Sequence, residues 1–150
     1  MTYWVQFMEE RRWMPGTVLV IPSDVPPFVH FVMVEFVDFN TGVEYAIHNM
    51  PGIGVARALL DDVIGGKPVR AWWMPPTREA GEAAILRLRS LIGHPYHITE
   101  ANCEHVIRWA VTGVWKSEQV SAVQIGLLIA GAVAVAASLQ RGRGARRARR

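Results

Sequence analysis

The sequence predicts an α+β fold in which an antiparallel sheet comes first, helices follow, and a hydrophobic helix ends the chain. Three observations carry this prediction. Residues 15–75 are rich in Val, Ile, Phe and Trp and are interrupted by Pro and Gly turn signals. Residues 77–113 change to the spacing of an amphipathic helix. Residues 120–139 carry no charge at all.

The sheet region predicts four strands, each an apolar run bounded by turn residues. The turn between the second and third strands is expected at Asn40-Thr41-Gly42. The expected strands are GTVLVI (16–21), VHFVMVEFV (29–37), VEYAIH (43–48) and VRAWWM (69–74). The segment GIGVARALLDD (52–62) contains no phosphate-binding loop pattern.

The helical region predicts two helices. Thr77 is a good N-cap for the first, and its apolar residues recur at helical spacing up to Gly93: Ala80, Ala84, Leu88 and Leu91. After HPYHIT, a second helix is expected to begin at or near Asn102.

The C-terminal segment 120–140 predicts a transmembrane or membrane-inserted helix. At 1.5 Å per residue, twenty uncharged residues span roughly 30 Å, the thickness of a bilayer core. An Ala-rich helix buried in protein is the alternative. The tail 141–150 holds six arginines and no acidic residue, whereas the rest of the chain is more acidic than basic. The tail therefore accounts for the isoelectric point of 9.5, and nucleic-acid binding by the whole chain is not expected.

The expected domains are thus 1–119, 120–140 and 141–150, with the membrane as a partner. Residues 1–16 are broken by charges and lack the apolar core of a secretory signal. We expect the first domain to face the cytosol. Arginines after a membrane helix favour keeping that end cytosolic too, and a single span cannot keep both ends on one side. Three arrangements stay open: a tail anchor, a helix in the plane of the membrane, and an exported first domain.

Cys103 is the single cysteine, which excludes an intramolecular disulfide and a zinc site built from several thiolates. The histidines also lack helical zinc-motif spacing, so neither a metal nor a cofactor is expected. With Asn102 as N-cap, Cys103 lies at the positive end of a helix, where thiol pKa values fall. Its helical neighbours are apolar and should turn the sulfur toward the sheet: Val106, Ile107, Ala110 and Val111.

A reactive thiol needs a base, and the chain offers five histidines: His30, His48, His94, His97 and His105. His105 follows Cys103 by two residues, about 200° around a helix, and should face away from the sulfur. His30 opens the second predicted strand and His48 closes the third. From spacing alone, each histidine is more often structural than catalytic.

The run NCEHVIRWAVTG with SEQV after it, preceded by LRSLIGHPYHITEA, resembles the lecithin:retinol acyltransferase-like family. PGTVLVI, HFVMV and YAIH follow in that family's order. The family belongs to the NlpC/P60 superfamily of permuted papain-like thiol enzymes and includes small phospholipase/acyltransferases. Thr17 and Val106 depart from the family, which usually has Asp and Phe there.

The resemblance implies a site and an activity. Cys103 would be the nucleophile, His30 the base and His48 the third polar partner, while Asn102 would position the helix start whose N–H groups stabilise an oxyanion. The implied substrate is a phospholipid acyl ester, attacked through a thioester. The loop residues His94, Tyr96 and His97 would face the substrate.

Two other functions are kept open. One is a cysteine peptidase or amidase, as in other branches of the superfamily. The other is a non-catalytic membrane-remodelling or binding module.

The non-catalytic module draws support from the spacing of His30 and His48. A plain hairpin turning at FNTG pairs Asp38 with Val43 and so places His48 opposite Met33, three residues or about 10 Å from His30. A β-bulge near VDFN (37–40) would reduce this gap.

Overall fold

In the computed structural model of the protein, residues 13–147 are described, with side chains described through residue 134. The chain divides into two units, Met1–Ser117 and Glu118–Arg150. The elements of the first unit are β1 (Val18–Pro22), β2 (Val29–Val37), β3 (Glu44–Met50), β4 (Gly54–Leu59), α2 (Leu60–Ile64), β5 (Arg70–Trp73), α3 (Arg78–Arg89) and α4 (Cys103–Thr112). The second unit contains α5 (Glu118–Arg147).

The five strands form one antiparallel sheet in the order β4-β3-β2-β1-β5, which confirms the predicted α+β class with a sheet followed by helices. The four predicted strands are present with small shifts at their ends. Two further elements, β4 and α2, were not predicted, and both begin within the segment 52–62. Ala and Arg are weak strand formers, and β4 exists because β3 supplies its hydrogen-bonding partner along the full length.

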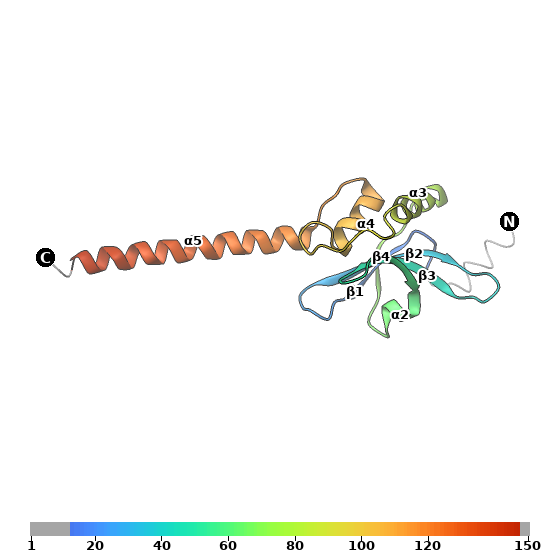
Figure 1. The fold of residues 1–150 in the computed structure, drawn as a ribbon, viewed down its shortest axis with the longest axis horizontal. Coiled ribbons are helices and arrows are strands. Elements are labelled where there is room, and N and C mark those ends of the chain that lie inside the picture. The colour runs from blue at the N-terminus through green and yellow to red at the C-terminus, as the bar shows by residue number, and fades with distance from the viewer. Residues whose placement is uncertain (1–12, 148–150) are drawn as a thin grey trace. The chain divides into compact units, whose positions relative to one another are not determined.

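The sheet separates two cores. On one face, α3 and α4 cover a cluster that includes Val18, Val20, Phe31 and Met33, together with Cys103 (Figure 1). On the other face, α2 covers a smaller cluster made of Leu19, Val32, Val34, Ala46 and Leu60. The alternation of side chains along β1 and β2 sorts their residues between the two faces. We call the first face the α4 face and the second the α2 face.

The helix α3 lies directly on the backbone that leads into β1. Thr77 caps it, as predicted, by accepting a hydrogen bond from the Ala80 N–H at 3.2 Å. Gly16 has φ of +88°, and a Cβ there would lie 2.6 Å from the Cα of Gly81 in α3. A Cβ on Gly81 would in turn lie 2.9 Å from the carbonyl oxygen of Pro15. Only glycine fits this crossing.

A β-bulge in β2 corrects the predicted register of the histidines. Val34 pairs with Ala46, but Phe36 pairs with Tyr45, so Glu35 is an extra residue in β2. His48 therefore lies opposite Val32, and the prediction that it faces Met33 was wrong. The bulge also lies before the expected stretch 37–40. Because one residue of shift moves a strand's side chains to the other face, the bulge puts His48 on the α2 face, with Val32.

An ion-paired cluster holds the bulged residue. The Glu35 side chain is fully buried and accepts hydrogen bonds from Arg57 Nε at 2.5 Å and Arg57 Nη2 at 2.6 Å. Arg89 Nε on α3 donates to the same carboxylate at 2.5 Å. Burial alone would raise the pKa of Glu35, but the hydrogen bonds and charges of the two arginines outweigh it and the pKa is lowered. Glu35 is thus fixed from both β4 and α3.

The second unit consists of the single long helix α5, which includes the predicted segment 120–140. Along its described part it exposes apolar side chains: Val123, Ile125, Leu127, Leu128, Ile129 and Val133. Among the described residues, no helix is both long and apolar enough to cross a membrane. The side chains of residues 135–140 and of the arginine tail 141–150 lie outside the described set, as do residues 1–12.

Candidate active site

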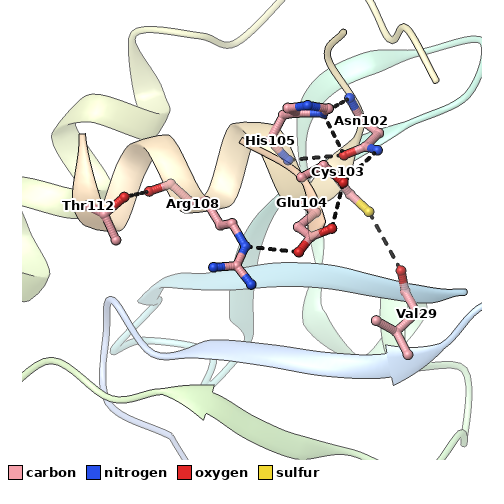
Figure 2. A network of polar contacts seen from close by, with 8 residues as sticks. Val29, Asn102, Cys103, Glu104, His105, Arg108 and Thr112 are labelled. Carbon is pink, nitrogen blue, oxygen red and sulfur yellow. Dashed lines mark hydrogen bonds and ion pairs between the residues drawn. The ribbon is translucent and has the colours of Figure 1, made fainter. Parts of the chain in front are cut away.

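The N-terminus of α4 has the cap that the sequence predicts. Asn102 Oδ1 accepts a hydrogen bond from the His105 N–H at 3.0 Å, and the His105 ring nitrogen faces the Asn102 N–H at 3.5 Å, which completes a capping box (Figure 2). His105 is buried and bound to its own cap, so its ring is committed to the helix start. His105 therefore serves the helix cap and is not expected to be the base for Cys103, although it lies two residues from it.

The thiol of Cys103 lies beside the backbone of β2. Its Sγ is 3.8 Å from the carbonyl oxygen of Val29, and Figure 2 shows the side chain pointing from the helix start to that strand. The Phe31 N–H also faces the sulfur. β3 pairs with β2 only from Val32 onward. The pairing with β3 therefore begins beyond the Val29 carbonyl and the Phe31 N–H. The sulfur lies against these backbone groups of Val29 and Phe31.

The environment of the thiol corrects the predicted direction of its pKa. Cys103 is 7% exposed, and burial raises its pKa above the usual value. Backbone N–H groups of Phe31, Glu104 and Cys103 lower the pKa, while the charge of Glu104 raises it, and the net direction is upward. The helix N-terminus acts as expected, but desolvation is the larger effect. The resting form is the neutral thiol.

The structure brings His30 and His48 together. His30 Nε2 lies 3.0 Å from His48 Nδ1, with the two rings in an edge-to-face arrangement. Burial lowers the pKa of His30 to about 4, with further contributions from the charges of His48 and Lys67. Burial also lowers the pKa of His48. Both imidazoles are therefore neutral near pH 7, and one donates to the other.

The thiol and His30 both lie at the start of β2. Among the described residues, no hydrogen bond joins the thiol to either histidine of the pair. The sulfur contacts groups of Val29 and Phe31, the two neighbours of His30. By strand alternation, Phe31 points to the α4 face and His30 to the α2 face. Because Nε2 of His30 is bound to His48, Nδ1 is the ring nitrogen left for the thiol, and proton transfer requires a turn of the His30 side chain or a bridging water.

A buried polar network that the sequence analysis missed supports the Cys103 backbone. Glu104 accepts from Arg108 Nε at 2.9 Å and from Ser117 Oγ at 2.6 Å (Figure 2). Asn102 Nδ2 donates to Ser117 Oγ at 3.3 Å. The network thus links both residues that flank Cys103. The spacing of Glu104 and Arg108, four residues apart on a helix, is the sequence signal that could have revealed part of it.

The three loop residues predicted to face a substrate have different surroundings. Tyr96 lies near the thiol: burial raises its pKa, and the Cys103 charge raises it further. His94 accepts a hydrogen bond from the Val55 N–H through its carbonyl at 2.9 Å, and its ring contacts Trp115. His97 bridges to Ala101 through the backbone. Contact with a substrate stays a prediction for all three.

Asn49 is a further polar residue that the sequence analysis did not single out. It follows His48, is fully buried, and donates from Nδ2 to the Ala101 carbonyl at 2.6 Å. That bond ties β3 to the segment immediately before Asn102. Its Oδ1 has no hydrogen-bond partner among the described residues. The only sequence signal was an amide at the end of a predicted strand.

The lowered histidine pKa values predict a loss of stability in mild acid. Below its ordinary pKa of 6.5, His30 takes up a proton in the unfolded chain but not in the folded one until the pH reaches about 4. Its contribution is therefore fully present above pH 6.5 and is lost as the pH falls to 4, by up to about 3 kcal/mol. Urea unfolding at pH 7 and pH 4 measures it.

Other groups with lowered pKa values also lose stability as the pH falls: His48, His105 and Glu35. The contribution of His30 is therefore isolated by comparing the native chain with His30→Asn. The variant should lose less stability between pH 7 and pH 4 than the native chain. Equal losses in the two proteins would contradict the burial of a neutral His30.

Within the part of the chain that the structure describes, no group of three or more potential metal-ligating side chains comes together. Comparison of the sequence with models of known protein families finds no match, and no curated protein matches it. The functional assignment therefore depends on the residues themselves.

Proposed function

We propose that this protein is a cysteine-dependent acyltransferase or hydrolase that acts on phospholipid acyl esters through a thioester intermediate. One observation carries the proposal: a neutral, hydrogen-bonded histidine pair whose first member, His30, lies between the two backbone groups that contact the Cys103 sulfur. A thiol at a helix N-terminus and a neutral imidazole on the strand that the sulfur contacts are the parts of a nucleophile and a general base.

In the first step, His30 takes the Cys103 proton at Nδ1, through a bridging water or after a turn of its side chain, while Sγ attacks the ester carbonyl carbon. A C–S bond forms, and the carbonyl electrons move to the oxygen. The N–H groups of Cys103 and Glu104 at the start of α4 would stabilise that oxyanion. The C–O bond then breaks, and the leaving alcohol takes the proton from His30. The product is a thioester on Cys103.

In the second step, water, an amine or an alcohol attacks the thioester, and His30 removes its proton. The C–S bond breaks and the proton returns to the sulfur, which restores the thiol. His48, bound to Nε2 of His30, holds the ring in one orientation. The buried neutral thiol fits a mechanism in which deprotonation accompanies attack.

We further propose that the fold is the permuted papain-like arrangement of the lecithin:retinol acyltransferase-like family. Support comes from the order of the parts: a strand histidine, a second strand histidine, then a cysteine that begins a helix packed on the same sheet. The resemblance of NCEH and the two histidine strands to that family is the second support. Asn102 acts here through its cap on α4.

The direct test is intact-mass analysis of the full chain after incubation with a phosphatidylcholine of defined acyl chains. We expect an acyl adduct on Cys103 that hydroxylamine removes, because hydroxylamine cleaves thioesters. Leu86→Ala, a change of an exposed residue on α3, is the matched control and should form the same adduct. Absence of the adduct and of free fatty acid in the native chain would contradict the proposal.

A second candidate is a non-catalytic module of the same fold. The raised thiol pKa, and the lack of a thiol–imidazole hydrogen bond among the described residues, favour it. The discriminating measurement is the iodoacetamide rate of Cys103 at pH 7. A rate no faster than that of a model thiol, combined with no acyl adduct, would support this module over an enzyme. A peptidase or amidase would instead cleave an amide substrate and leave the phospholipid intact.

We also propose that α5 associates with a lipid surface, with the first unit facing the cytosol. The support is its row of exposed apolar side chains, from Val123 to Val133. Flotation with anionic vesicles should carry the full chain and not a chain ending at Ser117. Equal flotation of both would contradict a role for α5.

A further inference from the structure

An apolar cavity lies at the end of the sheet where β1, β2 and β5 meet. Its volume is about 200 Å³, and it is lined by Val20, Ile21, Pro22, Val29, Val69 and Arg70 among others. Arg70 is exposed and is the charged residue of the lining. The remaining named lining residues have apolar side chains.

Val29 is shared by the cavity and the surroundings of the thiol. This residue lines the cavity, and its carbonyl oxygen is the atom 3.8 Å from Cys103 Sγ. Val20 belongs to the same buried cluster as Cys103, and Val29 packs against that cluster. Val20 and Val29 therefore place their side of the cavity on the α4 face, whereas Val69 packs against the cluster of the α2 face, and one residue separates the cavity from the sulfur.

The size and lining fit an alkyl chain of medium length. One water-sized group takes up about 30 Å³, so a cavity of this volume holds roughly seven such groups. Burying each methylene improves binding by about fourfold until the space is filled. A lipid headgroup or another charged ligand would fit less well, because Arg70 is the one charged side chain in an otherwise apolar lining.

We propose that this cavity is the acyl-chain subsite, which holds roughly the first six to eight carbons of a chain whose electrophilic carbon lies at Cys103. The assignment of the electrophile as an acyl carbon rests on the proposed function, whereas the binding of an alkyl chain beside the thiol does not. Longer chains would extend past the exposed Arg70 at the rim.

The test is the rate at which a series of N-alkylmaleimides, from ethyl to dodecyl, modifies Cys103 in the full chain. Each reagent adds the same ring to the same thiol, so the rates relative to N-ethylmaleimide report chain binding alone. We expect the relative rate to rise about fourfold per methylene at low reagent concentration and to level off near eight carbons. A rate that does not depend on chain length would overturn the proposal.

A filled cavity should remove this dependence. Pro22 lines the cavity, pairs with Val29 and by strand alternation shares the face of Val20. Pro22→Trp is expected to flatten the series while leaving the N-ethylmaleimide rate unchanged, and Leu86→Trp, on the exposed surface of α3, is the matched control that should keep the native series. A Pro22→Trp chain that keeps the native series would contradict the assignment of this cavity.

A competition experiment on the native chain covers the case in which Pro22→Trp does not fold. Octan-1-ol should slow modification by N-octylmaleimide, and butan-1-ol at the same concentration should not. Equal effects of the two alcohols would overturn the subsite. Because no ester is cleaved in any of these reactions, a flat maleimide series with an intact acyl adduct rejects only the subsite. A rising series with no acyl adduct rejects only the proposed function.

Discussion

Cys103→Ala is expected to lower phospholipid acyl transfer by about a thousandfold or more, because the variant has no atom that can form the thioester. His30→Asn should cost a comparable factor, since the proposed base and the proposed nucleophile would act as one unit. The double variant should then lose little beyond either single one. Release of a fluorescent acyl chain, followed over time at matched protein concentration, measures all three.

The pH dependence of kcat/KM separates a catalytic His30 from a structural one. A base with a pKa of about 4 gives an acid limb near pH 4, well below the ordinary histidine value. The charge of His48 contributes to that low pKa, so His48→Gln should move the acid limb to higher pH and reduce the rate less than His30→Asn. An acid limb near 6.5 in the native chain would contradict the assignment of the buried His30 as base.

The double variant Arg57→Met with Arg89→Met is expected to destabilise the fold by about 3–5 kcal/mol. The two arginine side chains are 44% and 42% exposed, but the Glu35 carboxylate is fully buried and would lose both partners. With the arginines removed, burial alone acts on Glu35 and its pKa rises. Urea unfolding at pH 7 gives the size of the loss.

Two comparisons test whether the buried charge is the cause. The loss should be smaller at pH 4 than at pH 7, because a protonated Glu35 no longer needs a cation. Adding Glu35→Met to the double variant should recover most of the stability, since an apolar cluster of similar volume replaces the ion pairs. If the triple variant is as unstable as the double, packing by the arginine stems and not charge holds the bulge.

Most of the fold followed from local patterns. The strand pattern and the Pro and Gly turns predict four of the five strands, and Thr77 and Asn102 predict two helix starts that the structure confirms. β4 was missed because its residues are weak strand formers and its pairing with β3 is a contact between segments. Such pairing has no signature in a short window of sequence.

The candidate site was harder to predict because its distances depend on register and burial. The sequence leaves open a bulge near residues 37–40 that would bring the histidines closer, whereas the structure has a bulge at Glu35, held by arginines from β4 and α3. The helix position of Cys103 predicts a lowered thiol pKa, but the amount of water excluded from the sulfur is a tertiary property, and it reverses the direction. Asn49 and Ser117 contribute through partners far away in the chain.

The contact of Gly16 with Gly81 has a consequence for finding relatives of this protein. Two positions 65 residues apart each exclude any side chain, because a single methyl group on either would meet backbone atoms of the other segment. A distant relative can therefore change nearly every core residue by compensating exchanges, but it cannot fill this crossing without moving α3 away from the sheet. Paired glycines at this separation, ahead of a cysteine that begins a helix, form a search pattern that needs no overall sequence similarity.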